Sequence, residues 1–295
     1  MSDKTTHKYR FAFLSISLLI IFAFSIFPLI YSLVLSLFDG RGNNLQFAGF
    51  ANYQRLISDK TVLIALFNTT IFTLILAPAV LFISILLANT INRIPSQKMK
   101  SIFSVILFFP SITSTVAYSF FFKRFFAEDG FLNDILGTIG FNNTTTNYLF
   151  LPLGARTAIV MVCIWAWTGY YTMLILSAMQ NIDPILYKSS IMDGANARQI
   201  LFRVTIPVLK PVILLCSVLL AGGIFQLFAE VMIITKGGPQ QSTLTLAYYI
   251  YMLCFNYVPQ YGYAASIGAV MFLISVVLSI VQIIIGEREN EKNKV

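Results

Sequence analysis

The sequence predicts an all-α integral membrane protein with six transmembrane helices, both termini cytoplasmic, and a helix-containing cytoplasmic loop between spans four and five. Of the 295 residues, 57% are hydrophobic and only 11% are charged, whereas soluble domains carry about 25% charged residues. The apolar residues also form long runs, as expected of helices that cross a bilayer. These observations exclude a soluble enzyme, a disordered chain and a disulfide scaffold.

Six apolar runs reach the length of about 20 residues that a membrane-spanning helix needs. The predicted spans are residues 11–38, 67–91, 101–122, 157–180, 209–235 and 263–286. The first run is too long for the apolar part of a signal peptide and lacks a small-residue cleavage site, so it is expected to be retained. The predicted organisation is a cytoplasmic tail over 1–10, a six-span domain over 11–286 and a second cytoplasmic tail over 287–295.

The distribution of Lys and Arg predicts the orientation, because cytoplasmic loops of membrane proteins are enriched in these residues. With the N-terminus inside, about two thirds of the 20 basic residues lie in the inner segments. The net charge of +8 therefore indicates topology and contacts with anionic headgroups rather than nucleic acid. The chain has one histidine, His7, and its three cysteines lack the spacing of a disulfide or metal site. A histidine-based catalytic or metal site is not expected.

The longest inner connection, residues 181–208, contains helical signals of its own. Asp183 is a typical N-cap, Pro184 suits the first helical position, and Gly194 is a typical helix stop. We expect a helix of roughly ten residues, followed by a second amphipathic stretch over 196–204. Because so short a helix is marginal alone in water, it should rest on something. Two interpretations stay open: a connector lying on the headgroups, or a docking site for a cytoplasmic partner.

The same loop carries a motif. Asp193-Gly194-Ala195 is followed at the expected spacing by Val204-Thr205-Ile206-Pro207, which resembles the EAA loop of binding-protein-dependent ABC transporter permeases. The opening Glu-Ala-Ala of that motif is replaced by Lys188-Ser189-Ser190, which reverses the charge that commonly meets a positive group on the ATPase. In the family, this loop forms a coupling helix seated in a cleft of the ATPase subunit. The resemblance thus implies ATPase-coupling roles for Tyr187, Lys188, Ser189, Ser190, Asp193, Gly194, Ala195 and Pro207.

Further short motifs run from about residue 45 to the end of the chain. They are Phe50-Ala51-Asn52-Tyr53, Asn68-Thr69, Phe109-Pro110-Ser111, Thr235-Lys236-Gly237-Gly238-Pro239, Ser242-Thr243-Leu244 and Gly262-Tyr263-Ala264-Ala265. Their order and spacing resemble the carbohydrate-uptake group of these permeases, specifically the first of its two paired subunits. The resemblance implies a multi-pass bacterial inner-membrane (plasma-membrane) protein. It would form the path for a sugar, with an oligosaccharide favoured, delivered by an extracytoplasmic solute-binding protein.

The chain has no G-x-x-x-x-G-K-[ST] phosphate-binding motif, so it is not expected to be an enzyme that hydrolyses ATP. The resemblance implies as partners two ABC ATPase subunits that bind ATP-Mg, a second homologous permease subunit and the solute-binding protein. No cofactor or metal is expected in this chain. The alternative is an ATP-independent secondary transporter or channel, although no internal repeat is evident and one acidic residue within the predicted spans is little for proton coupling. A membrane-embedded enzyme is not favoured, because no paired carboxylates or Ser/His arrangement is present.

Candidate substrate contacts lie in spans four and five, where aromatic faces suit pyranose stacking. Gln226 and Glu230 are four residues apart, which places them on one face of a continuous helix. The substrate-path candidates are Trp167, Tyr170, Tyr171, Gln226 and Glu230. Alternatives are an interfacial aromatic belt including Trp165 and pairing of Glu230 with a cation on the second permease. Gly222-Gly223 indicates close helix packing, and the outer stretch 123–156, with Asn142-Asn143-Thr144, either contacts the solute-binding protein or is a solvated connector.

Overall fold

The computed structural model describes residues 14–42, 44–139, 147–256 and 258–292, and these are almost entirely helical. With η marking a 3-10 or π turn, the elements are η1 (Phe22–Ile26), α2 (Phe27–Leu35), β1 (Phe38–Arg41), β2 (Asn44–Phe47), α3 (Ala51–Ser58), α4 (Lys60–Asn92), α5 (Gln97–Ile112), α6 (Thr115–Phe125), α7 (Phe131–Thr138), η2 (Tyr148–Phe150), α8 (Pro152–Gln180), α9 (Pro184–Met192), α10 (Ala197–Ile200), η3 (Leu201–Thr205), α11 (Ile206–Phe225), η4 (Val231–Thr235), α12 (Leu246–Tyr251), η5 (Met252–Asn256) and α13 (Tyr261–Lys292).

Within the described residues, five helical runs are long and apolar enough to cross a membrane, and a bent pair of helices brings the number to six. The five are Leu14–Leu35, Lys60–Asn92, Pro152–Gln180, Ala197–Phe225 and Tyr261–Ile284, and the pair is α5 with α6. The six-span, all-α class is therefore confirmed. The N-terminal tail with His7, and Asn142-Asn143-Thr144, lie outside the described residues; α13 continues to Lys292, past the predicted start of the C-terminal tail.

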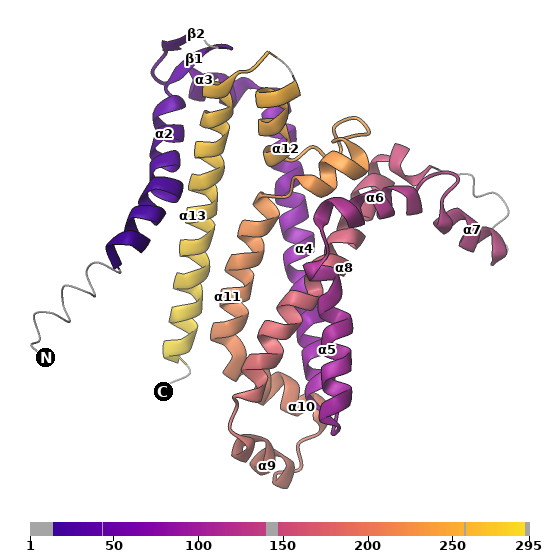
Figure 1. Cartoon of the computed structure of the whole chain (residues 1–295). Helices are drawn as coiled ribbons and strands as arrows, with labels where there is room; N and C mark the ends of the chain where they lie inside the picture. Colours follow the sequence, from indigo (N-terminus) through magenta and orange to yellow (C-terminus); the bar gives the residue numbers. More distant parts are fainter. Residues whose placement is uncertain (1–13, 43, 140–146, 257, 293–295) are drawn as a thin grey trace, which may run out of the picture. The chain divides into compact units, whose positions relative to one another are not determined.

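The third span is bent, so the predicted continuous helix over 101–122 is wrong. The axes of α5 and α6 differ by 91°, and the residues between them, Thr113 and Ser114, have non-helical backbone angles. Pro110 occupies the last turn of α5, and the helix ends two residues later at Ile112. As a result α5 alone is about 24 Å long, and α6 crosses one end of it (Figure 1).

The fifth span also differs from the predicted range of 209–235. Its helix already begins at Ala197, where Asn196 and Gln199 form a capping box, so the amphipathic stretch 196–204 is the first part of the span. The π turn η3 ends two residues before Pro207, whose ring would clash with a carbonyl one turn earlier in a regular α-helix. The helix then ends at Phe225, and η4 is a separate short element.

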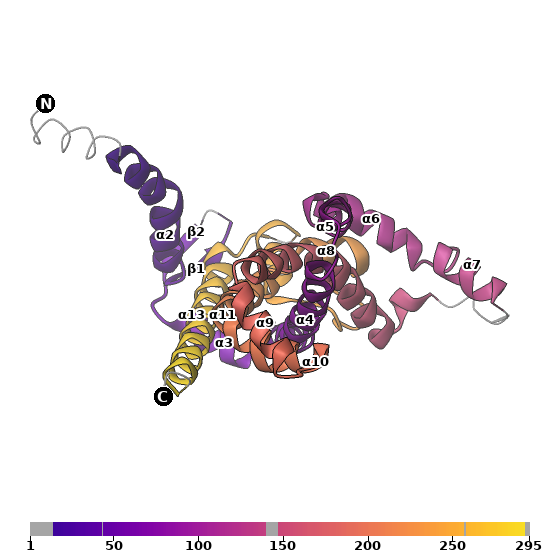
Figure 2. The same cartoon turned by 90° about the horizontal axis from the view of Figure 1, so that it is seen from below.

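The chain divides into two compact units, Met1–Val62 with Tyr249–Leu273 and Leu63–Tyr248 with Ile274–Val295. In the second unit, α8 packs against both α5 and α11 (Figure 1, Figure 2). The Ser84 hydroxyl of α4 donates to the Thr168 carbonyl of α8, at 3.1 Å. Figure 1 shows α9 and α10 at one end of this unit and α6 and α7 at the other.

The closest approach of α8 and α5 requires a glycine. A Cβ atom on Gly169 would overlap the carbonyl oxygen of Leu107, whereas a Cβ on Gly222 or Gly223 would meet no heavy atom within 4 Å. Within this chain, the close helix packing predicted at Gly222-Gly223 is therefore found at Gly169 instead.

We expect Gly169→Ala to lower the free energy of unfolding by about 1–3 kcal/mol, because the added methyl group forces α5 and α8 apart. Gly222→Ala is the matched control; its methyl group has open space, and alanine favours helix over glycine by roughly 1 kcal/mol. Thermal unfolding of the purified chain in detergent measures both. Equal midpoints for the two variants would contradict the assignment of this contact.

In the first unit, two of the sequence motifs meet on one segment of backbone. The Asn52 amide donates to the carbonyl oxygens of Ser36 (2.9 Å) and Phe38 (2.7 Å). Gly262 lies so close to the same Phe38 carbonyl that a Cβ atom would overlap it. The motifs at residues 50–53 and 262–265 therefore hold the start of the β1–β2 hairpin, in which Phe38 pairs with Phe47.

The carboxylate of Asp59 accepts several hydrogen bonds in this unit. The Tyr263 hydroxyl donates to its Oδ2 at 2.7 Å and the Tyr249 hydroxyl at 3.3 Å, while the Thr61 amide donates to Oδ1 at 2.8 Å. The Arg55 guanidinium lies 3.8 Å from the centre of the Tyr263 ring. Burial raises the pKa of Asp59, but these hydrogen bonds lower it by more, so the pKa lies below its ordinary value of 3.8.

A depressed carboxylate pKa makes stability depend on pH with a defined sign. The contribution of Asp59 is fully present above the unfolded-state pKa of about 4 and is lost as the pH falls through the lower folded-state value. We expect the difference in unfolding midpoint between the wild type and Asp59→Asn to be constant above about pH 5 and to close toward pH 3. Thermal unfolding in detergent across this range tests it; a difference independent of pH would disprove it.

Candidate functional site

The helix of the inner loop forms as its sequence predicts. The Asp183 carboxylate accepts a hydrogen bond from the Ile185 amide at 2.8 Å, and α9 begins at Pro184. At the other end Gly194 has a φ of +78°, and the Ala195 amide donates back to Ser190 at 3.0 Å. The N-cap and the glycine stop are therefore both confirmed, and they leave a helix of nine residues.

Most of α9 is exposed, including several large apolar side chains. Lys188, Asp193 and Gly194 are exposed, and among the described residues Lys188 has no ion-pair partner. The exposed apolar side chains are Ile185, Leu186, Ile191 and Met192, the last at 83%. A short helix that exposes this much apolar surface at the end of a helical unit is typical of a docking surface.

The remaining coupling candidates are less exposed or lie outside α9. Tyr187 and Ala195 turn toward a cavity of about 410 Å³ that is also lined by Asn89, Asn92, Arg93, Ile191, Ala197, Ile200 and Thr205. Ser189 and Ser190 are half-buried, and their hydroxyls donate to the Leu186 carbonyl. Pro207 lies at the start of α11. The structure thus brings all the candidates except Pro207 together on or beside α9.

A second group of residues lies around the middle of α8. A pocket of about 220 Å³ is lined by Ser111, Ala166, Trp167, Tyr170, Tyr171, Leu220 and Gly223. Three of the five predicted substrate-path residues are therefore neighbours. The rings of Tyr170 and Tyr171 meet edge to face, with centroids 5.2 Å apart, and Tyr170 is 43% exposed. None of the lining side chains is charged, so the pocket suits a neutral ligand with apolar faces and hydroxyl groups.

Ser111 is the residue of this pocket that sequence reasoning missed. Its hydroxyl donates to the Ala166 carbonyl at 2.8 Å and accepts from the Tyr170 amide at 3.1 Å. These two backbone groups are partners in a regular α-helix, so the serine joins the end of α5 to α8 beside the aromatic rings. The signal was present in the Phe109-Pro110-Ser111 motif, but the motif gave no indication of which helix the hydroxyl contacts.

Gln226 and Glu230 do not join this pocket, and the prediction that they share one helix face is wrong. The α11 helix ends at Phe225, so Gln226 caps it in an exposed position. After the break, Glu230 is only 4% exposed and accepts a hydrogen bond from the Tyr118 hydroxyl at 2.7 Å. The sequence spacing failed because it assumed an unbroken helix.

A further group of polar contacts in the second unit joins three segments that are far apart in the sequence. The Asn68 amide donates to the carbonyl oxygens of Gln241 (2.7 Å) and Leu244 (3.0 Å). The Arg156 guanidinium donates to the Asn68 side-chain oxygen (3.0 Å) and to the Ser242 carbonyl (2.8 Å). The motifs at 68–69 and 242–244 therefore meet in space. Arg156 is the last residue of the predicted outer stretch 123–156, and its sequence context gives no sign of these contacts.

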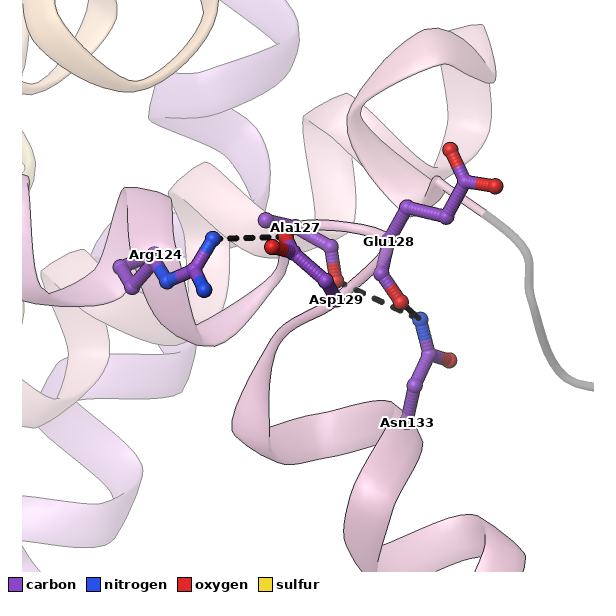
Figure 3. A network of polar contacts seen from close by, with 5 residues as sticks. All are labelled: Arg124, Ala127, Glu128, Asp129 and Asn133. Atoms are coloured by element: carbon purple, nitrogen blue, oxygen red, sulfur yellow. Dashed lines mark hydrogen bonds and ion pairs between the residues drawn. The ribbon is translucent and has the colours of Figure 1, made fainter.

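The start of the predicted outer stretch 123–156 is folded into a turn between α6 and α7 (Figure 3). Arg124 forms an ion pair with Asp129 at 2.6 Å, and its hydrogen bond lowers the pKa of that exposed carboxyl. The Asn133 amide donates to the carbonyl oxygens of Glu128 (2.8 Å) and Ala127 (3.3 Å). The ion pair and these hydrogen bonds hold the turn that connects α6 to α7.

Six apolar spans, a capped exposed helix between the fourth and fifth, and an aromatic pocket among the spans define a membrane permease subunit. Comparison with known proteins agrees: residues 80–290 match the family described as "Binding-protein-dependent transport system inner membrane component". The chain belongs to this family, and the resemblance seen in its motifs is confirmed. The family also places the chain in the inner membrane.

Curated relatives cover nearly the whole chain. It is 39% identical over 272 residues to the lactose transport system permease protein LacF of Rhizobium radiobacter, covering 92% of this chain and 91% of the relative. It is 30% identical over 262 residues to the arabinooligosaccharides transport system permease protein AraP of Halalkalibacterium halodurans, covering 88% and 81%. A chain in the crystal structure of a bacterial ABC transporter that imports the acidic polysaccharide alginate has the same fold, with a TM-score of 0.84, 23% identity and 97% of both chains covered.

Proposed function

We propose that the chain is the permease subunit of an ATP-driven importer and forms part of the path for a neutral sugar. The observation that carries this proposal is the pocket lined by Ser111, Trp167, Tyr170 and Tyr171, which has no charged side chain. Aromatic rings stack on the apolar faces of a pyranose, and the Ser111 hydroxyl has one lone pair left to accept a hydrogen bond from a sugar hydroxyl. The curated relatives named above are permeases for lactose and for arabinooligosaccharides, which supports an oligosaccharide.

The energy would come from other chains. Two ABC ATPase subunits would bind ATP-Mg, and α9 would sit in a cleft of one of them through its exposed apolar side chains. Closure of the ATPase pair would then move α9 and, through it, α8 and the α10–α11 helix. The family commonly has glutamate where this chain has Lys188. We therefore expect an acidic side chain of the ATPase, in place of a basic one, to contact this position.

The remaining partners complete the path. A second homologous permease would supply the other wall, and an extracytoplasmic solute-binding protein would deliver the sugar at the end of the unit that carries α6 and α7. This arrangement requires α9 and both chain ends on the cytoplasmic side, as the distribution of basic residues predicts. A related alginate transporter has been crystallised with a pentasaccharide-bound periplasmic protein.

Co-purification separates the proposal from its alternative. Affinity isolation of the chain from its native membrane should recover a second six-span protein and an ABC ATPase, and liposomes containing this complex should take up sugar only with ATP and the solute-binding protein. Uptake by the purified chain alone, driven by an ion gradient, would instead establish a secondary transporter. The basal ATPase activity of the complex, measured without sugar, controls for loss of protein during reconstitution.

A further inference from the structure

Glu230 is a buried acidic side chain that the proposed sugar pocket does not use. It is 4% exposed, and its Oε1 accepts a hydrogen bond from the hydroxyl of Tyr118, which is 5% exposed. No lysine, arginine or histidine among the described residues forms an ion pair with it. Burying a carboxyl group is costly, so its retention at this position calls for an explanation in terms of what it contacts.

The contact joins two short elements, each of which follows an interruption in a long helical segment. Tyr118 belongs to α6, which follows the 91° bend after α5. Glu230 directly precedes η4, which follows the break after Phe225. The two elements pack against each other, and the Tyr118 ring also packs edge to face with Trp165 of α8, with centroids 5.9 Å apart. At the end of η4, the Thr235 hydroxyl is hydrogen-bonded to that of Thr243 at 2.7 Å.

We propose that Glu230 is a positioning residue: through Tyr118 it holds α6 and η4 together as one element. This element would move as a unit during transport, with its flexible points at residues 113–114 and 226–228, the two places where helical structure is interrupted. The inference rests on the proposed transport function. It assigns Glu230 the role of a hydrogen-bond acceptor, in place of the substrate contact or partner-cation contact expected from the sequence.

The acceptor role predicts an unusual order among variants. Glu230→Gln keeps a side-chain oxygen of the same reach, so the bond to Tyr118 survives although the charge is removed. Tyr118→Phe keeps the ring against Trp165 but removes the donor. We therefore expect Glu230→Gln to retain the wild-type ratio of sugar transported to ATP hydrolysed, and Tyr118→Phe to lower it about two- to tenfold, the range set by one hydrogen bond. Tyr148→Phe removes a hydroxyl that has no hydrogen-bond partner among the described residues and is the matched control.

A distance measurement tests the movement as a unit. Spin labels would be placed at Phe121 of α6 and at Lys236 after η4, both exposed, in a complex whose native cysteines have been replaced. The distance between the labels should be the same in the ATP-free and vanadate-trapped states of the wild type and of Glu230→Gln, and should become broad or shifted in Tyr118→Phe.

Two outcomes overturn the inference. One is a wild-type distance that changes between the two states, which means that α6 and η4 move separately. The other is loss of coupling in Glu230→Gln with normal coupling in Tyr118→Phe, which means that the charge matters and the hydrogen bond does not. If the wild-type complex itself shows no ATP-driven uptake, the proposed function fails independently of these variants.

Discussion

Gly194→Asp is expected to reduce ATP-driven sugar uptake to background while the chain still inserts into the membrane. Gly194 has a φ of +78°, a conformation that costs an L-residue roughly 1–2 kcal/mol. The new carboxylate would also stand beside Asp193, at the carbonyl end of α9, where the helix dipole disfavours negative charge. A nine-residue helix has little stability to spare, so the surface that should meet the ATPase would lose its shape.

The measurement compares sugar-stimulated ATPase activity and uptake in liposomes with the amount of complex recovered. Gly42→Asp is the matched control. Gly42 also has a positive φ, of +63°, and a Cβ atom there would meet no heavy atom within 4 Å. It lies in the β1–β2 turn and not in the coupling loop, so the substitution repeats the backbone strain and the added charge at a different place. Uptake should be near wild type in Gly42→Asp. Normal coupled uptake in Gly194→Asp would show that α9 is not the coupling element.

Tyr170→Ala is expected to lower sugar uptake about tenfold or more, while Tyr170→Phe stays near the wild type. The tyrosine ring is the most exposed of the three aromatic rings that line the pocket, and losing its contact with a sugar face should cost at least the roughly 1.4 kcal/mol that corresponds to a tenfold effect. The hydroxyl is not required by this argument, because Ser111 binds the Tyr170 backbone rather than its side chain.

Uptake rates at several sugar concentrations, with basal ATPase activity as the reference, distinguish a weakened pocket from a damaged fold. Phe103→Ala is the matched control: Phe103 is an aromatic residue of α5 with a similar exposure of 42%, and it does not line the pocket. Wild-type uptake by Tyr170→Ala would place recognition entirely in the solute-binding protein. A loss that Tyr170→Phe shares would indicate a hydrogen bond from the hydroxyl instead of stacking.

The sequence predicts what depends on local signals. Apolar runs locate all six spans because a bilayer demands them, and the ends of α9 are predicted because Asp183 and Gly194 act on their own neighbours. The bend after Ile112 and the break after Phe225 were missed, since hydropathy does not distinguish a straight apolar helix from an interrupted one.

The pocket was predicted in part for the same reason. Trp167, Tyr170 and Tyr171 lie within five residues of one another, so any helix brings them close. Ser111 and Tyr118 act across more than 50 residues of sequence, and their partners are chosen by packing rather than by spacing. Periodicity within one helix cannot specify such pairs.

The contacts of Asn68 also set an order for biogenesis. The Gln241 carbonyl, which accepts from the Asn68 amide, lies 173 residues further along the chain. A ribosome adding about 5–20 residues per second needs roughly 10–35 s to reach it. During that interval α4 can already contact α8 through Ser84 and Thr168. The bonds from Asn68 to the 241–244 segment form only after that segment has been synthesised, so they are among the last contacts of this unit to be made.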